Sequence, residues 1–166
     1  VFPDGDGGAY RNDIKEALDW VTQHIDDYNI LSVNLSLGGG QFDTEYITYG
    51  SYSSQFKSLA DNDVIAVAAS GNSYAKKQIE GVSYPSSDLY ALSIGAVFPE
   101  SSSLRSSAGY AQQGSVDSIA AFSQRDSDLS DVFAPGVWID SSYLDGTYKK
   151  LNGTSMASPE VAGMVA

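Results

Sequence analysis

The stretch NDVIAVAASGN, residues 62–72, contains a nearly continuous apolar run from Val64 to Ala69. A strand with one face in water alternates apolar and polar residues, whereas an unbroken apolar run is typical of a strand buried on both faces. The run ends at Gly71 and Asn72. This stretch therefore predicts a central strand of a sheet that is covered on both sides.

An amphipathic helix is expected before this strand. It starts after Asn12, a predicted N-cap. A strand is expected within NILSVNLSLGGG, residues 29–40, and a second helix over residues 51–60. The apolar residues of the first helix recur with the spacing of one helix face, at Ile14, Ala17, Leu18, Val21 and Ile25.

The second half of the chain continues the alternation of helices and strands. LYALSIGAV, residues 89–97, predicts another buried strand, and residues 132–134 predict a short one. Residues 137–152 are typical of a hairpin, and a last helix begins near Ser155. Because helix-length spacers separate apolar strands, we expect an α/β fold with a parallel sheet flanked by helices.

The composition limits the classes of function. The chain has 166 residues, 42% of them hydrophobic, and no cysteine, so it suits one domain without disulfides or thiolate metal sites. Its net charge of −12 repels nucleic acid and anionic membranes, and we expect neither as a partner. No apolar run reaches the roughly 18 to 20 residues that span a bilayer.

A candidate nucleophile lies in LNGTSMASPEVAG, residues 151–163. Ser155 stands at the predicted start of the last helix, where backbone N–H groups and the helix dipole favour negative charge. A serine needs a base to accept its proton and N–H donors to meet the oxyanion that forms. The motif taken by itself fits an ordinary N-cap serine better than a nucleophile.

Several stretches resemble the subtilisin-like serine proteases, the subtilases. NGTSMASPEVAG is similar to the nucleophile motif of that family, VNLSLGGG to one wall of its substrate cleft, and VIAVAASGNS to the segment with its oxyanion-hole asparagine. YPSSDLYALSIGAV and DVFAPGVWI also match in position and character. The resemblance implies the three-layer subtilisin-like fold, without the N-terminal strands of its sheet.

The resemblance also implies roles for individual residues. Ser155 would be the nucleophile of a serine endopeptidase, and the Asn72 side chain and the Ser155 N–H would be the oxyanion donors. Asn72 could equally be a turn residue after glycine, and the cleft glycines could simply end strands. The residues expected to pair with an extended polypeptide substrate are Ser36, Leu37, Gly38 and Gly39. The walls of the pocket for the side chain before the scissile bond are expected to be Gly38, Gly39, Ala68, Ala69, Ser70 and Gly71.

The chain departs from the family in lacking the aspartate and histidine motifs of the catalytic triad. Its only histidine, His24, lies in the first predicted helix and is expected on the helix surface. Residues 1–166 therefore correspond to a partial catalytic domain, from beyond the catalytic histidine to just past the nucleophile. We expect the chain alone to be inactive and the full-length protein to hydrolyse peptide bonds through an acyl-enzyme on Ser155.

Two alternatives remain open at this point. One is a non-catalytic, subtilase-like module that binds extended peptides, and the other is an assembly whose missing strands come from another chain. An unpaired sheet edge would also favour self-association. The resemblance further implies secretion.

No cofactor is required for the chemistry. Some subtilases nevertheless bind a cation, and the resemblance implies a candidate structural calcium site formed by carbonyls near Leu89 and Ala91 and by Asp131, although Asp131 could equally cap a turn. Asp4 to Gly8, DGDGG, resembles the start of a calcium-binding loop. It is interpreted as a polar turn, because the residues at the later positions of such a loop do not match its ligand and glycine pattern.

Overall fold

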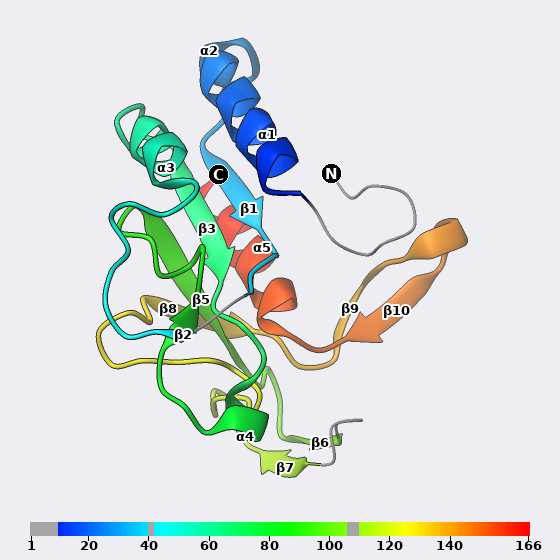
Figure 1. Ribbon diagram of the computed structural model, residues 1–166. Helices are drawn as coiled ribbons and strands as arrows, with labels where there is room; N and C mark the ends of the chain where they lie inside the picture. The colour runs from blue at the N-terminus through cyan, green and yellow to red at the C-terminus, as the bar shows by residue number, and fades with distance from the viewer. Residues whose placement is uncertain (1–9, 40–41, 106–109) are drawn as a thin grey trace.

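A computed structural model describes residues 10–39, 42–105 and 110–166. Four parallel strands form the main sheet in the order β1-β3-β5-β8 (Figure 1). Their bounds are Ser32–Leu35 for β1, Ile65–Ala69 for β3, Ala91–Val97 for β5 and Val132–Pro135 for β8. The predicted parallel sheet is confirmed.

Helices cover both faces of this sheet. Helices α1 (Arg11–Gln23) and α3 (Ser53–Ala60) lie on one face, and α5 (Thr154–Val165) lies on the other. The central strand β3 alternates between the two layers, since Ala66 and Ala68 pack with α3 while Val67 packs with α5. This alternation explains the continuous apolar run and confirms the three-layer α/β fold.

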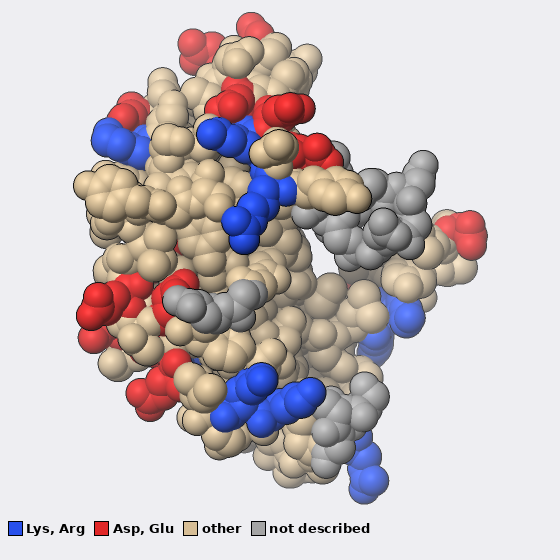
Figure 2. Space-filling model, in the orientation of Figure 1, with Lys and Arg blue, Asp and Glu red and all other residues tan. Residues whose placement is uncertain are grey.

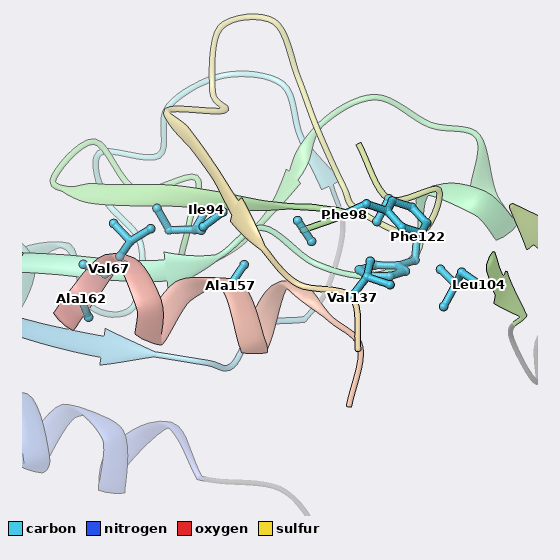
Figure 3. Packing of buried hydrophobic residues seen from close by; sticks show 12 residues of the cluster. Val67, Ile94, Phe98, Leu104, Phe122, Val137, Ala157 and Ala162 are labelled. Atoms are coloured by element: carbon cyan, nitrogen blue, oxygen red, sulfur yellow. The ribbon is translucent and has the colours of Figure 1, made fainter. Parts of the chain in front are cut away.

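The layer between the sheet and α5 is built from small side chains near the helix and large ones beyond it. Figure 3 shows Ala162 of α5 near Val67, and Ala157, farther along the helix, nearer to Ile94. At the far end of the layer, Phe98 and Phe122 fill the space beside the sheet. Small residues on α5 let its backbone approach the sheet closely, and this fixes the position of its N-terminal turn.

Two of the boundaries that differ from the expectation have a local cause in the structure. Asn12 is not the N-cap of α1, because Tyr10 occupies that position and its carbonyl accepts the Ile14 N–H at 3.2 Å. Strand β5 begins at Ala91, because Asp88 turns the chain just before it: its carboxylate accepts the Tyr90 N–H and its carbonyl the Ala91 N–H. In both places a local hydrogen bond sets the boundary.

Smaller elements surround the sheet. The predicted hairpin consists of β9 (Ile139–Ser142), the 3₁₀ turn η1 (Leu144–Gly146) and β10 (Tyr148–Leu151), and it projects from the body of the molecule. The remaining elements are α2 (Ile25–Tyr28), β2 (Phe42–Asp43), α4 (Tyr74–Lys77), β4 (Val82–Ser83), β6 (Ser102–Arg105) and β7 (Ala111–Gly114). Strand β2 pairs with β4 and β6 pairs with β7, both antiparallel.

Strand β1 forms one edge of the main sheet. Among the described residues it pairs with β3 only, and a groove of about 300 Å³ runs between it and α1, with Leu18, Val21 and Val33 in its walls. The predicted unpaired edge is therefore present, whereas self-association through it stays a prediction.

Charge is unevenly spread over the surface. Figure 2 shows acidic side chains gathered at the top of the molecule, where Figure 1 places α1 and α2. Within residues 10–39, 42–105 and 110–166, no helix has the length and apolar character needed to span a membrane. The segment Asp4 to Gly8 lies outside the described residues.

Candidate active site

Ser155 lies in the first turn of α5, two residues after the N-cap Gly153. Gly153 has a φ of +156°, a conformation that glycine adopts far more readily than other residues. The Ser155 side chain is half-buried, and its hydroxyl donates to the backbone carbonyl of Ser36 at 3.3 Å. The nucleophile candidate therefore faces the end of β1 across the cleft.

Asn72 reaches the same place from the end of β3. Its side-chain oxygen accepts two hydrogen bonds from Thr154, one from the backbone N–H at 2.8 Å and one from the hydroxyl at 3.1 Å. Both polar atoms of the Asn72 side chain lie beside Gly153: the amide nitrogen is 3.5 Å and the oxygen 3.6 Å from the place where a Cβ on Gly153 would stand. The fully buried Thr154 thus holds the side chain of Asn72 beside the start of α5.

Polar side chains of β1 bind the first turns of α5. The Ser36 hydroxyl donates to the Ser155 carbonyl at 2.7 Å, and the Ser158 hydroxyl donates to the Asn34 side-chain oxygen at 2.6 Å. Ser32 extends this line by donating to the Ala162 carbonyl at 2.9 Å. Alternate residues of a strand share one face, so these bonds fix the distance between β1 and the Ser155 turn.

The two candidate catalytic residues line one cleft of about 370 Å³. Most of the predicted substrate-binding residues line it as well. Those that do are Ser36, Leu37, Gly38, Gly39, Ala69 and Gly71. The described lining includes no charged side chain, so a substrate group that enters it meets only neutral partners.

Ala68 and Ser70 are not brought to the cleft surface. Ala68 is fully buried among apolar residues on the α3 side of the sheet. Ser70 is also fully buried, and its hydroxyl donates to the Gln124 carbonyl at 2.8 Å. Both support the wall from behind, because the pleat of β3 turns alternate side chains away from the cleft.

The cleft contains four residues that the sequence did not single out: Phe42, Ser73, Ser83 and Thr154. Thr154 precedes Ser155 within the quoted motif, and Ser73 follows Asn72, so both could have been proposed as neighbours. Phe42 and Ser83 come from β2 and β4, which are each two residues long. A strand so short leaves no hydrophobic period by which a sequence pattern could find it.

His24 lies at the end of α1, away from this cleft. Its Nδ1 is 2.8 Å from the Trp20 carbonyl, and its ring stacks on the Trp20 ring with 4.2 Å between centroids. Among the described cleft residues there is no His, Asp or Glu that could take the Ser155 proton. Glu160, farther along α5, is partly buried, and this burial raises the pKa of its carboxyl.

The residues of the expected calcium site share a second cavity, of about 550 Å³. Leu89, Ala91 and Asp131 all line it, and Asp131 accepts the Ser93 N–H at 2.7 Å. Calcium usually takes six to eight oxygen ligands, and Asp131 is the only predicted ligand that offers a carboxylate. Among the described residues no cluster of three His, Cys, Asp or Glu could hold a metal. Calcium binding thus stays a prediction.

The parallel sheet thus places a serine at a helix N-terminus and an asparagine side chain in one cleft, an arrangement that serine hydrolases use. The sequence model of the subtilase family matches residues 1–166, so the chain belongs to this family. The family is one of serine proteases.

Curated relatives support this assignment. The chain is 33% identical to subtilisin DY of Bacillus licheniformis, over 96% of its own length and 48% of the relative. It is 32% identical to subtilisin E of Bacillus subtilis (strain 168), over 98% of its own length and 36% of the relative. The chain therefore spans between about a third and a half of these relatives.

Solved structures agree with the fold. A cold-adapted subtilisin-like serine proteinase is 28% identical, with a TM-score of 0.69 over 95% of this chain and 47% of that one. The prenylagaramide maturation protease PagA, at 23% identity, has a TM-score of 0.72 over 98% of this chain and 50% of that one, and supports the fold alone.

Proposed function

We propose that this chain forms the part of a serine endopeptidase that carries the nucleophile and the oxyanion hole. The observation that carries the proposal is the convergence of the Ser155 hydroxyl and the Asn72 amide in one uncharged cleft. Because the chain spans at most about half of the relatives described above, the base that activates Ser155 is proposed to come from a segment before Val1.

The proposed reaction uses each of these groups once. Ser155 Oγ attacks the carbonyl carbon of the scissile peptide while its proton passes to the base. The negative charge on the carbonyl oxygen is met by the Asn72 amide and by the Ser155 N–H, for which no acceptor exists among the described residues. The peptide C–N bond then breaks, the amine leaves with the proton, and water hydrolyses the ester.

Substrate binding is proposed to use the end of β1. The Ser36 carbonyl, which accepts the Ser155 hydroxyl in this structure, would instead accept an N–H of an extended substrate. The segment from Ser36 to Gly39 would then pair with the substrate as an added strand. The substrate class is an extended polypeptide, and secretion of the protein is part of the same proposal.

The test is to label the full-length protein with a fluorophosphonate, which reacts with an activated serine. We expect labelling to disappear in the Ser155→Ala variant, and kcat to fall by about 10² to 10³ in Asn72→Leu, the loss seen for one oxyanion donor in this family. We expect residues 1–166 alone to show no labelling, since they lack a base. Failure of the full-length protein to label would contradict the endopeptidase.

A non-catalytic peptide-binding module is the second candidate function. The specific observation in its favour is that no base lines the described cleft, although six of the eight residues predicted to bind substrate line it. An upstream reading frame with the aspartate and histidine motifs would exclude this candidate. Peptide binding without fluorophosphonate labelling in the full-length protein would establish it.

A structural calcium ion at Asp131 is proposed in addition. A cation there would be bound by the Asp131 carboxylate together with backbone carbonyls near Leu89 and Ala91, which line the same cavity. Removal of calcium with a chelator should then lower the Tm of the full-length protein, and an Asp131→Asn variant should lose this dependence. An unchanged Tm on chelation would count against the site.

A further inference from the structure

The β9–β10 hairpin runs directly into the turn that carries Ser155. Strand β10 ends at Leu151, and Asn152 and Gly153 connect it to the first residue of α5. This connection is held at the base of the hairpin, where the Trp138 N–H donates to the Asn152 side-chain oxygen at 2.5 Å. The hairpin therefore keeps a fixed position beside the candidate nucleophile.

The hairpin and the described cleft lie on different sides of Ser155. Figure 1 shows β2, which contributes Phe42 to the cleft, and the hairpin on opposite sides of the first turn of α5. A polypeptide that pairs with Ser36 to Gly39 occupies the cleft with the residues before its scissile bond. Its residues after the scissile bond then continue past Ser155 toward the hairpin.

The two faces of the hairpin carry different side chains. In the register of β9 and β10, Lys149 lies opposite Ser141 and Leu151 lies opposite Ile139, so these four residues share one face. Leu151 and Ile139 are the only partly buried residues of the two strands. The face that they share, called the inner face below, is therefore the one turned toward the body of the molecule.

Lys149 is the one charged residue of the inner face. Its Nζ lies over the Tyr143 ring, 4.5 Å from the ring centroid, and it makes no ion pair with any described residue. The acidic residues of the hairpin lie elsewhere, with Asp140 opposite Lys150 on the other face and Asp145 in the turn η1. Since the ring contacts one side of the ammonium group, its other N–H donors are available to a ligand.

The charge of the whole chain gives this lysine its importance. At a net charge of −12 the surface as a whole repels acidic polypeptides, and the described lining of the cleft offers them no cation. Figure 2 shows acidic side chains gathered over α1 and α2, whereas basic side chains lie on the hairpin. A substrate carboxylate thus meets a positive charge on the hairpin side of Ser155.

We propose that Lys149 makes the site selective for glutamate or aspartate at the second or third residue after the scissile bond. The inference rests on the proposed endopeptidase function and names part of its substrate. Lys149 precedes Gly153 by four residues, which span at most about 13 Å in extended chain. An extended substrate rises equally fast, and the lengths of the lysine and glutamate side chains shorten the distance to two or three residues. The carboxylate bonds the ammonium on the side away from Tyr143.

The experiment uses the full-length protein and internally quenched peptides that differ only by glutamate or glutamine at one position after the scissile bond. At the second or third position we expect kcat/KM for glutamate to exceed that for glutamine by about 1.5- to 5-fold, the range of an exposed ion pair. This Glu:Gln ratio should approach 1 in about 1 M salt, which screens the charges. It should fall to about 1 in Lys149→Gln and below 1 in Lys149→Glu.

The matched control is Lys150→Gln. It removes the same charge from the next residue of the same strand, and its side chain projects from the other face of the hairpin. We expect Lys150→Gln to keep the Glu:Gln ratio. An equal loss of the ratio in both variants would assign the effect to net charge and would overturn the role of the inner face.

Failure of this selectivity is distinguishable from failure of the proposed function. Fluorophosphonate labelling needs an activated serine and no residue after a scissile bond, so it reports on the endopeptidase alone. A protein that labels and that cleaves the peptides with the same Glu:Gln ratio before and after Lys149→Gln would overturn the selectivity only. If no peptide is cleaved, Kd values for the glutamate and glutamine peptides on the Ser155→Ala variant decide, and equal values would overturn the selectivity.

Discussion

The hydroxyl of Thr154 is expected to connect the two segments that form the candidate oxyanion site. These are the end of β3, with Gly71 and Asn72, and the start of α5, with Ser155. The Thr154 hydroxyl accepts the Gly71 N–H at 3.1 Å and donates to the Asn72 side chain at 3.1 Å, in a fully buried position. A Thr154→Val substitution keeps the volume and removes only the hydroxyl. The Gly71 N–H then loses its acceptor, and an unsatisfied buried donor costs about 1 to 3 kcal/mol.

Urea unfolding measures this cost. We expect the midpoint of Thr154→Val to fall with an unchanged m-value, and the Tm to fall by about 2 to 12 °C at about 2 to 4 °C per kcal/mol for a protein of this size. The matched control is Thr154→Ser, which retains both hydrogen bonds and loses one methyl group, worth about 1 kcal/mol.

Amide hydrogen exchange separates the two variants. The Gly71 amide should exchange at least about tenfold faster in Thr154→Val, because its hydrogen bond is gone, and should stay protected in Thr154→Ser. If the valine variant is as stable as the unchanged protein and its Gly71 amide exchanges as slowly, the hydroxyl does not hold this junction, and the proposed orientation of Asn72 loses its support.

Three further substitutions test the sheet and its surroundings. Gly95→Ala should cost about 1 to 3 kcal/mol, because the new Cβ would stand 2.3 Å from the Phe133 ring, and double-mutant analysis should find this cost largely absent in a Phe133→Ala background. Ser93→Ala, on the same strand, should stabilise the protein by up to about 1 kcal/mol in thermal unfolding, because its buried hydroxyl has no partner among the described residues. Burial raises the pKa of the Asp88 carboxyl above 3.8, although its bonds from Ser53 and Tyr90 oppose the shift. The stability that Asp88 contributes is therefore complete below pH 3.8 and is lost as the pH rises through the raised pKa, so unfolding free energies measured across this window should fall less in Asp88→Asn.

The sequence predicted the layers of the fold because its apolar pattern is local. The run from Val64 to Ala69 indicated a strand covered on both faces, and the stripe through Leu18 indicated the helix that covers one of them. The first residue of β3 shows the limit of this reasoning, since Ile65 is 40% exposed at the end of the sheet. The residue types of a strand do not indicate where the helix that covers it ends.

The placement of Ser155 and Asn72 in one cleft was expected from the resemblance of their motifs to those of the subtilases. The bonds that orient them were not, because Thr154 and Asn72 are far apart in the chain and no pattern links a threonine to a distant amide. The split of the predicted pocket residues, with Ala69 on the wall and Ala68 behind it, depends on the pleat of one strand.

The sequence by itself thus indicated the strands of the main sheet, the helices that cover it, the family and the candidate nucleophile, since each of these depends on residues that are neighbours in the chain. Only the tertiary structure decided that Phe42 stands opposite Ser83 at the base of the cleft. Strands of two residues have no period, and their pairing is stabilised by contacts with parts of the chain that local sequence cannot specify.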